Sequence, residues 1–254
     1  MSKIYSPDYF KKQLPEWKRK KDPILSRIIY RPISFLIASV CANNGINANT
    51  VSYFSGLVAI VACSLFILEG YYWHIAGAIL INIWLLLDCT DGNLARSYKK
   101  QPFGEFADGI SSYILVGLMG AAMGVAVYFE GGIIISVNNP WIILVGALAS
   151  SSDTLMRLIY HKYKATEREL AEIGVLEIER DIRLDHNQVG DIRIRIEAEL
   201  GVGGILPLAI LVATICHALD IIVIYCFLYY GLSCLFSLVY FVRKAIIAST
   251  IYRM

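Results

Sequence analysis

Charged residues are scarce in this chain. Asp, Glu, Lys and Arg make up 17% of its 254 residues, and neither sign dominates. A net charge of +2 is too small for a protein that binds polyanions, so we expect no nucleic-acid partner. The six cysteines form no CxxC pair and no cluster with histidine, and we interpret them as small apolar packing residues. No internal repeat and no low-complexity segment is present.

A cleavable signal peptide is not expected either. The first residues are polar and basic, and no short apolar segment with a small-residue cleavage site follows them. We interpret residues 1–21, which include Lys18-Arg19-Lys20-Lys21, as a basic cytoplasmic arm. Residues 22–42 mix apolar side chains with two arginines, which favours an amphipathic helix in the membrane interface, bent at Pro32. The alternative is a cytoplasmic extension that packs on a helix bundle.

Apolar sequence is abundant. The hydrophobic content is 57% and the mean hydropathy is +0.57, whereas soluble domains are about 45–50% apolar. Several segments approach or exceed the roughly 18–20 apolar residues that cross a bilayer. We predict an all-α integral membrane protein in which residues 1–44 form the arm and the interfacial amphipathic helix, and residues 45–254 form a domain of six transmembrane helices. The predicted spans are residues 50–68, 73–96, 106–129, 140–162, 202–219 and 221–242.

Three of the predicted loops contain no Lys or Arg, namely residues 69–72, 130–140 and 217–220. All 23 Lys and Arg residues then lie on the other side of the membrane, which the positive-inside rule makes cytoplasmic. An even number of spans puts both termini on that side. We therefore predict a multi-pass protein of the cell (inner) membrane whose termini and functional site face the cytoplasm.

Acidic residues lie at the cytoplasmic ends of the second and third predicted spans. Asp88 and Asp91 are three residues apart, so they share one face of a helix. Gly104, Asp108 and Ser112 follow at intervals of four residues and share a face of the next helix. A carboxylate at membrane depth costs about 2.5–3.5 kcal/mol or more, which makes it a functional candidate. Carboxylates on two facing helices can hold divalent cations through oxygen ligands.

The residues around these acids suit a diphosphate. Gly92 has no side chain and leaves room beside Asp91 for a phosphate and its metal. Ala95, one turn later on the same face, has only a small side chain. Arg96 and Lys99 lie at the cytoplasmic end, where a diphosphate would arrive. Mg²⁺ on that diphosphate would neutralise its charge and activate the leaving group. The alternative is that the aspartates merely line a polar helix interface.

This stretch resembles the motif of the CDP-alcohol phosphotransferase family, D-x2-D-G-x2-A-R-x7 or 8-G-x3-D-x3-D. The chain departs from that motif only at the last position, where Ser112 replaces aspartate. The resemblance implies a membrane enzyme of phospholipid or surface-glycoconjugate synthesis. Such an enzyme moves a substituted phosphate group from a CDP-linked donor to an acceptor and releases CMP. The matching positions are Asp88, Asp91, Gly92, Ala95, Arg96, Gly104 and Asp108.

The resemblance also implies roles for single residues. Asp88, Asp91 and Asp108 would ligate metal, with two ions of Mg²⁺ or Mn²⁺ expected and the second weakened by Ser112. Catalysis would involve Asp91, Asp108 and the position of Ser112. Ala48 to Ser52 is similar to the family's P-N-x-x-T entry to the first span, although helix capping by Asn47 or Asn49 also explains it. The residues implied to bind the CDP moiety are Asn49, Ser52, Asp88, Gly92, Ala95, Arg96 and Gly104.

Ser112 stands where the family has its general base, and a serine hydroxyl has no useful basicity near neutral pH. Three explanations are open. The acceptor is already ionised, as a phosphate or phosphonate would be. Another residue serves as base, with Glu105 and Asp153 as candidates, although Asp153 is explained more simply by an ion pair with Arg157. Or the chain is a catalytically impaired family member that binds CDP-lipid.

The sequence gives less information about the identity of the donor and the acceptor. Neither the acceptor nor the choice between CDP-diacylglycerol and a soluble CDP-alcohol follows from the sequence. The alternative enzyme is an intramembrane prenyltransferase, but the second Asp-rich cluster that it needs is missing. The family resemblance implies a homodimer, and small residues in 117–124 permit close helix contact. The candidates for binding an acidic acceptor, which the positive-inside rule also explains, are Arg157, Lys162, Arg193 and Arg195.

Overall fold

Helices dominate the computed structural model, which describes residues 4–175 and 198–252, and no strand occurs in these ranges. The all-α prediction is therefore confirmed. The helices are α1 (Pro7–Gln13), α2 (Glu16–Lys21), the π-helix η1 (Ser26–Tyr30), α3 (Arg31–Asn43), α4 (Ala48–Ile67), α5 (Tyr71–Ser97), α6 (Gly104–Glu130), α7 (Trp141–Glu172), α9 (Leu206–Ile215) and α10 (Leu219–Tyr252).

Five of the described helices, α4, α5, α6, α7 and α10, are long and apolar enough to cross a membrane. The chain is thus a multi-pass membrane protein. The predicted fifth span coincides with α9, which has only 10 residues. A helix of that length measures about 15 Å, half of the roughly 30 Å of a hydrocarbon core. The count of six spans stays a prediction.

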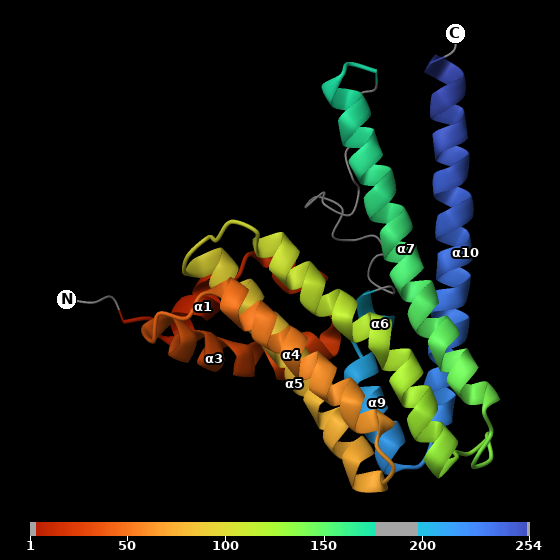
Figure 1. Ribbon diagram of the computed structural model, residues 1–254. Helices are drawn as coiled ribbons and strands as arrows, with labels where there is room; N and C mark the ends of the chain where they lie inside the picture. The colour runs from red at the N-terminus through yellow and green to blue at the C-terminus, as the bar shows by residue number, and fades with distance from the viewer. Residues whose placement is uncertain (1–3, 176–197, 253–254) are drawn as a thin grey trace.

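The long helices form a bundle from which two of them project (Figure 1). α4 packs against α5 and α6, α7 packs against α6, and α10 packs against α7. The connections α4–α5, α6–α7 and α9–α10 gather at one end of the bundle, at the bottom of Figure 1. These connections are the predicted loops without Lys or Arg. The α5–α6 connection lies toward the opposite end, as do the C-terminal parts of α7 and α10.

α7 and α10 are longer than their predicted spans. α7 has 32 residues and α10 has 34, because both helices continue past the apolar segments that predicted them. Helical hydrogen bonds do not need apolar side chains, and charged pairs such as Lys164–Glu167, at 2.6 Å, support the polar part of α7. The hydropathy pattern therefore located the apolar part of each helix and did not mark where the helix ends.

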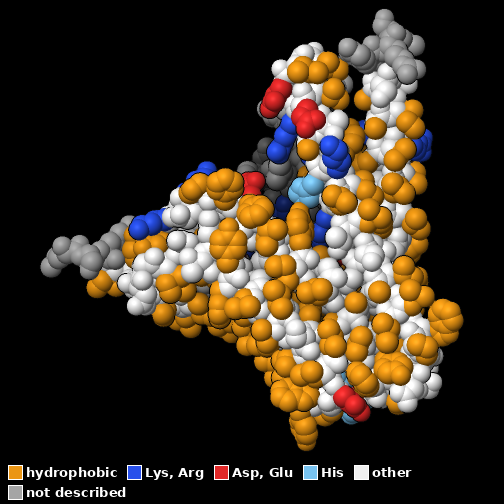
Figure 2. All heavy atoms as spheres, viewed as in Figure 1, with side chains coloured by type: hydrophobic (Ala, Val, Ile, Leu, Met, Phe, Trp, Pro, Cys, Tyr) orange, Lys and Arg blue, Asp and Glu red, His pale blue; other side chains and the backbone are white. Residues whose placement is uncertain are grey.

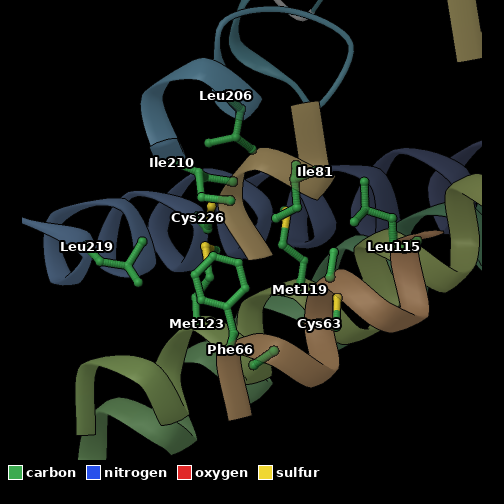
Figure 3. Packing of buried hydrophobic residues seen from close by; sticks show 14 of the residues in the cluster. Cys63, Phe66, Ile81, Leu115, Met119, Met123, Leu206, Ile210, Leu219 and Cys226 are labelled. Atoms are coloured by element: carbon green, nitrogen blue, oxygen red, sulfur yellow. The ribbon is translucent and has the colours of Figure 1, made fainter. Parts of the chain in front are cut away.

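One apolar core joins α4, α5, α6, α9 and α10 (Figure 3). Phe66, Ile81 and Met123 meet Ile210 of the short α9 in this cluster, and all four side chains are fully buried. The close packing of these side chains fixes α9 to the bundle despite its length. All six cysteines are free. Five of them are buried, as expected of packing residues, whereas Cys216 is exposed.

Glycines bring α6 and α7 into backbone contact. A Cβ atom on Gly146 would lie 2.2 Å from the carbonyl oxygen of Gly120, and one on Gly124 would lie 2.8 Å from the carbonyl oxygen of Ile142. Only glycine permits such an approach, as in other closely packed membrane helices. The small residues in 117–124, from which we predicted a contact between subunits, therefore pack within the chain. The homodimer stays a prediction.

The two faces of α3 differ in polarity. The buried face is mixed, with Arg31 and Ser34 next to apolar Phe35 and Ala38, whereas Ile33, Leu36 and Val40 are exposed. The π-helix η1 lies just before the bend that we predicted at Pro32. It ends where α3 begins, and Pro32 is the second residue of α3. Proline has no N–H to donate one turn back, and the wider π-helical turn accommodates this loss. The location of α3 in the membrane interface stays a prediction.

Candidate functional site

Three carboxylates meet where α5 and α6 face each other. One oxygen from each of Asp88, Asp91 and Asp108 lies within 4.8 Å of the other two. Residues 98–103 reverse the chain between the two helices, and Phe103 takes a left-handed conformation (φ 60°) just before α6 begins. The structure therefore brings together the three acids that the spacing singled out. Asp91 is the most enclosed of them, with 5% of its surface exposed.

A serine on α4 fixes the orientation of Asp91. The Ser52 hydroxyl donates a hydrogen bond of 2.6 Å to Asp91 Oδ2. Deeper in the bundle, Ser111 of α6 lies 2.7 Å from the Ser55 hydroxyl and accepts from Trp84 Nε1 at 2.9 Å. Buried polar groups joined in this way hold three helices in a fixed relation. Ser52, which we predicted as a contact to CDP, thus lies directly behind the acidic cluster.

The absence of a side chain at Gly92 lets Arg96 lie against the helix. A Cβ atom on Gly92 would approach the two terminal nitrogens of Arg96 to 3.0 and 3.2 Å. Arg96 also donates to Asn93 Oδ1 at 3.2 Å. The guanidinium is thereby held close to Asp91, at the end of α5 where we expected a diphosphate to arrive. Ala95 is exposed on the next turn.

Asn49 has a buried oxygen without a partner. Its Nδ2 donates to the carbonyl oxygen of Pro102 at 2.9 Å, but its Oδ1 makes no hydrogen bond. Asn47, rather than Asn49, caps α4 by accepting from Thr50 N at 3.0 Å. Capping therefore does not explain Asn49. A Cβ atom on Gly104 would lie 3.7 Å from the unpaired oxygen, so Asn49 Oδ1 faces the start of α6. Leaving such an acceptor unsatisfied costs about 1–3 kcal/mol.

A buried ion pair that we did not predict lies beside the acidic cluster. Arg31 makes a bidentate contact with Asp22, at 2.7 and 3.0 Å. It also donates to the carbonyl oxygen of Cys89 at 3.0 Å, and its charge acts on Asp88. Burial alone would raise the pKa of Asp22, but its hydrogen bonds and charge interactions with Arg31 and Lys18 lower that pKa below its usual value. No spacing rule links residues 22, 31 and 89, so the pair was invisible in the sequence.

A second group of polar contacts lies on α7 and joins it to α6. Asp153, which is 1% exposed, pairs with Arg157 at 2.9 Å, and this confirms the ion pair that we preferred for it. The guanidinium of Arg157 lies 5.9 Å from the centre of the Tyr113 ring. The Tyr113 hydroxyl lies 2.7 Å from His161 Nε2. Sequence patterns missed this contact because it joins residues 48 apart.

The remaining predicted residues occupy different places. Ser112 is partly buried on α6, one turn after Asp108, and Glu105 is exposed in the first turn of that helix. Lys162 is exposed on α7. Arg193 and Arg195 lie outside the described residues. Figure 2 shows a hollow between α6 and the projecting part of α7, along which Lys, Arg and His side chains gather.

Comparison with known protein families agrees with this site. The family model described as CDP-alcohol phosphatidyltransferase matches residues 46–177, just over half of the chain. The match extends from the start of α4 past the end of α7 and includes all the acidic residues of the motif. The chain belongs to the CDP-alcohol phosphatidyltransferase family, as the motif led us to expect. No match was found among curated proteins.

The site fits a divalent metal ion. Three carboxylates so close together repel one another unless a cation lies among them. Their oxygens are the hard ligands that Mg²⁺ and Mn²⁺ prefer. The family generally uses divalent metals, and the donor set formed by Asp88, Asp91 and Asp108 is consistent with that use.

Proposed function

We propose that this protein transfers a substituted phosphate group from a CDP-linked donor to an acceptor and releases CMP. The carboxylate cluster, formed by the family's motif positions on two facing helices, carries the proposal. The product would be a phospholipid or a precursor of a surface glycoconjugate. The donor is either CDP-diacylglycerol or a soluble CDP-alcohol.

In this proposal Asp88, Asp91 and Asp108 hold Mg²⁺ or Mn²⁺. When bound, the metal neutralises the diphosphate and stabilises the departing CMP. Ser52 keeps Asp91 Oδ2 in place and so limits the rearrangement that binding requires. A second ion would be held weakly, because Ser112 replaces the fourth carboxylate of the motif.

The donor would bind along α5 and the start of α6. Arg96 supplies a cation for the diphosphate, and Gly92 lets its guanidinium lie against the helix. Asn49 Oδ1, which is buried and unpaired, would accept a hydrogen bond from the nucleotide and so become satisfied. Ala95 and Gly104 have small or no side chains, so the donor could approach the backbone of α5 and α6 closely.

The acceptor would enter from the hollow between α6 and α7. Of the four basic residues that we predicted to bind the acceptor, Arg157 and Lys162 lie within the described residues. Arg157 forms an ion pair with Asp153. An acidic acceptor headgroup would therefore meet a partly neutralised Arg157 and an exposed Lys162. Nothing in the chemistry of these two residues selects among phosphate, carboxylate and phosphonate groups.

We also propose that the site faces the cytoplasm from the inner membrane, with α3 in the interface and a second copy of the chain as partner. The three loops without Lys or Arg lie at the end of the bundle away from the α5–α6 connection, which supports this orientation. The exposed stripe of Ile33, Leu36 and Val40 supports contact of α3 with lipid.

Two alternatives remain from the sequence. An impaired family member that only binds CDP-lipid is supported by Ser112. An intramembrane prenyltransferase would need a second acidic cluster, and within residues 4–175 and 198–252 the trio at the α5–α6 interface is the one group of three or more His, Cys, Asp or Glu side chains close enough to share a metal ion. The structure therefore offers no observation in favour of prenyl transfer.

Release of CMP tests the proposal. The purified protein in lipid nanodiscs would receive CDP-diacylglycerol or CDP-glycerol, MgCl₂, and one acceptor from a panel of glycerol 3-phosphate, inositol 1-phosphate, serine and an aminoalkyl phosphonate. We expect metal-dependent CMP release with at least one acceptor, and loss of it in Asp88→Asn. CDP binding without CMP release in every combination would instead support the impaired binding protein.

A further inference from the structure

Asn93 accepts hydrogen bonds from two arginines at a single oxygen atom. Arg31 Nη1 and Arg96 Nη2 both donate to Asn93 Oδ1, each at 3.2 Å. Asn93 lies on α5 between Asp91 and Arg96, at a position where the motif specifies no residue, and it is 2% exposed. Two cations repel each other, so they stay beside one oxygen atom only where each of them is held in place.

A serine on α3 fixes which end of the Asn93 amide faces the arginines. Asn93 Nδ2 donates to Ser34 Oγ at 2.9 Å, and Ser34 is fully buried. The Ser34 hydroxyl donates its own hydrogen to the carbonyl oxygen of Arg31 at 2.8 Å, so toward Asn93 it can only accept. The amide nitrogen therefore faces α3, and the amide oxygen faces the two arginines.

The two arginines are held in different ways. Arg31 is buried and occupied by its bidentate ion pair with Asp22. Arg96 is exposed, and among the described residues it donates only to Asn93 and pairs with no carboxylate. Its other N–H groups are left for a phosphate, which guanidinium donors bind in pairs. Because the Asn93 amide is neutral, it orients Arg96 without cancelling the charge that a phosphate needs.

On the proposed function, in which Arg96 binds the donor diphosphate, we propose that Asn93 is the positioning residue of Arg96. The amide holds one terminal nitrogen of the guanidinium, and Gly92 lets the rest of the group lie against the helix. A long side chain that is ordered in advance loses less entropy when the ligand binds, so affinity for the diphosphate rises.

The support for Asn93 comes from a part of the chain that precedes the family match. Arg31 and Ser34 belong to α3, whereas the match begins at residue 46. α3 packs against α5, and the contacts of Asn93 lie between these two helices. The N-terminal helices therefore take part in binding the diphosphate, although they do not touch it.

Binding of CDP by Asn93→Leu tests this role. The protein in nanodiscs would be titrated with CDP in MgCl₂, with the change made alone and in an Arg96→Gln background. We expect Asn93→Leu alone to lower CDP affinity about tenfold, the lower end for a hydrogen bond to a charged group. In the Arg96→Gln background it should lower affinity by roughly twofold at most, because Asn93 acts through Arg96. Losses of equal size in both backgrounds would show a merely structural role and overturn the assignment.

Kinetics of CMP release give a second readout. Asn93→Leu should raise KM for the CDP-linked donor about tenfold, in line with its loss of CDP affinity, and should leave KM for the acceptor unchanged. A distorted site would raise both KM values together, and that result would contradict a specific action on Arg96.

A milder change covers the case in which Asn93→Leu does not fold. Ser34→Ala removes the acceptor of Asn93 Nδ2 and should lower CDP affinity about threefold, the worth of a neutral hydrogen bond. Ser39→Ala is the matched control, because Ser39 lies on the same helix and donates to the carbonyl oxygen of Tyr5 at 2.6 Å. It should bind CDP normally. Equal CDP affinity in the two serine variants would contradict the support that Ser34 gives to Asn93.

These measurements keep the role of Asn93 separate from the proposed function. If the unaltered protein binds CDP and releases CMP but the variants at residues 34 and 93 match it, the positioning role is wrong and the proposed function stands. If the unaltered protein neither binds CDP nor releases CMP, both are wrong.

Discussion

The Ser52 hydroxyl on α4 donates a hydrogen bond of 2.6 Å to Oδ2 of Asp91 on α5, within the interface that carries the acidic cluster. A ligand carboxylate held by such a partner keeps one orientation before the metal arrives. α4 therefore contributes to the site by fixing a carboxylate of α5.

Removal of this partner should weaken metal binding. We expect Ser52→Ala to reduce Mg²⁺ or Mn²⁺ affinity by about 10-fold, the lower end of the range for partners of metal ligands. Titration of Mn²⁺ in the presence of CDP measures this. Ser64→Ala is the matched control, because Ser64 is exposed on the same helix and donates only to the carbonyl oxygen of Ile60. Equal affinity in Ser52→Ala and Ser64→Ala would contradict the role of Ser52.

The Asp22–Arg31 pair should support folding near neutral pH. Asp22→Asn leaves Arg31 buried without its counter-charge, and breaking such a pair costs about 3–5 kcal/mol. We expect a clearly lower thermal midpoint at pH 7. Glu16→Gln, which removes an exposed pair with Lys20, should change nothing measurable.

The same pair predicts a pH dependence. The folded pKa of Asp22 is lowered, so its contribution is fully present above the unfolded value of about 3.9 and is lost as the pH falls through the folded value. The gap between the unaltered protein and Asp22→Asn should therefore narrow in strong acid. A gap that is unchanged from pH 7 to pH 2 would rule out this origin.

Close packing of α6 on α7 should tolerate no side chain at Gly120. A Cβ atom there would lie 2.6 Å from the carbonyl oxygen of Gly146, a backbone atom that cannot move away alone. We expect Gly120→Ala to lower the thermal midpoint in detergent. Gly231→Ala on α10 is the control, because nothing lies within 4 Å of its Cβ position, and alanine there should be neutral or stabilise the helix by up to about 1 kcal/mol. Equal midpoints for the two variants would contradict this packing.

Ser112→Asp should strengthen metal binding by adding a fourth carboxylate one turn after Asp108. We expect a second Mn²⁺ ion to bind in the presence of CDP, measured by titration. Ser112→Asn is the control of similar size without charge. If Asp and Asn behave alike, residue 112 does not face the metals.

The local parts of this structure could be predicted from the sequence. Asp88, Asp91 and Asp108 were found because helical periodicity and one short connection decide which residues face each other. The long spans were found because the bilayer dictates apolar length. Both signals act over a few turns of helix.

The parts that were missed depend on packing between distant segments. In the sequence, Arg31 is typical of a basic residue that contacts lipid headgroups. In the structure it is bonded to Asp22, Cys89 and Asn93 instead. The glycines of α6 suit a contact between subunits as well as one with α7. Asn47 and Asn49 are equally good caps in the sequence. The structure distinguishes them, because Asn47 accepts from Thr50 N and Asn49 donates to the carbonyl oxygen of Pro102.

Metal-dependent binding of CDP tests the central claim most directly. The protein in nanodiscs would be titrated with CDP in MgCl₂ and again in EDTA, alongside Asp91→Ala. Because the carboxylates, the metal and the diphosphate form one set of contacts, we predict that CDP affinity falls at least tenfold in EDTA and in Asp91→Ala. Undiminished CDP affinity under both conditions would contradict a metal site formed by Asp88, Asp91 and Asp108.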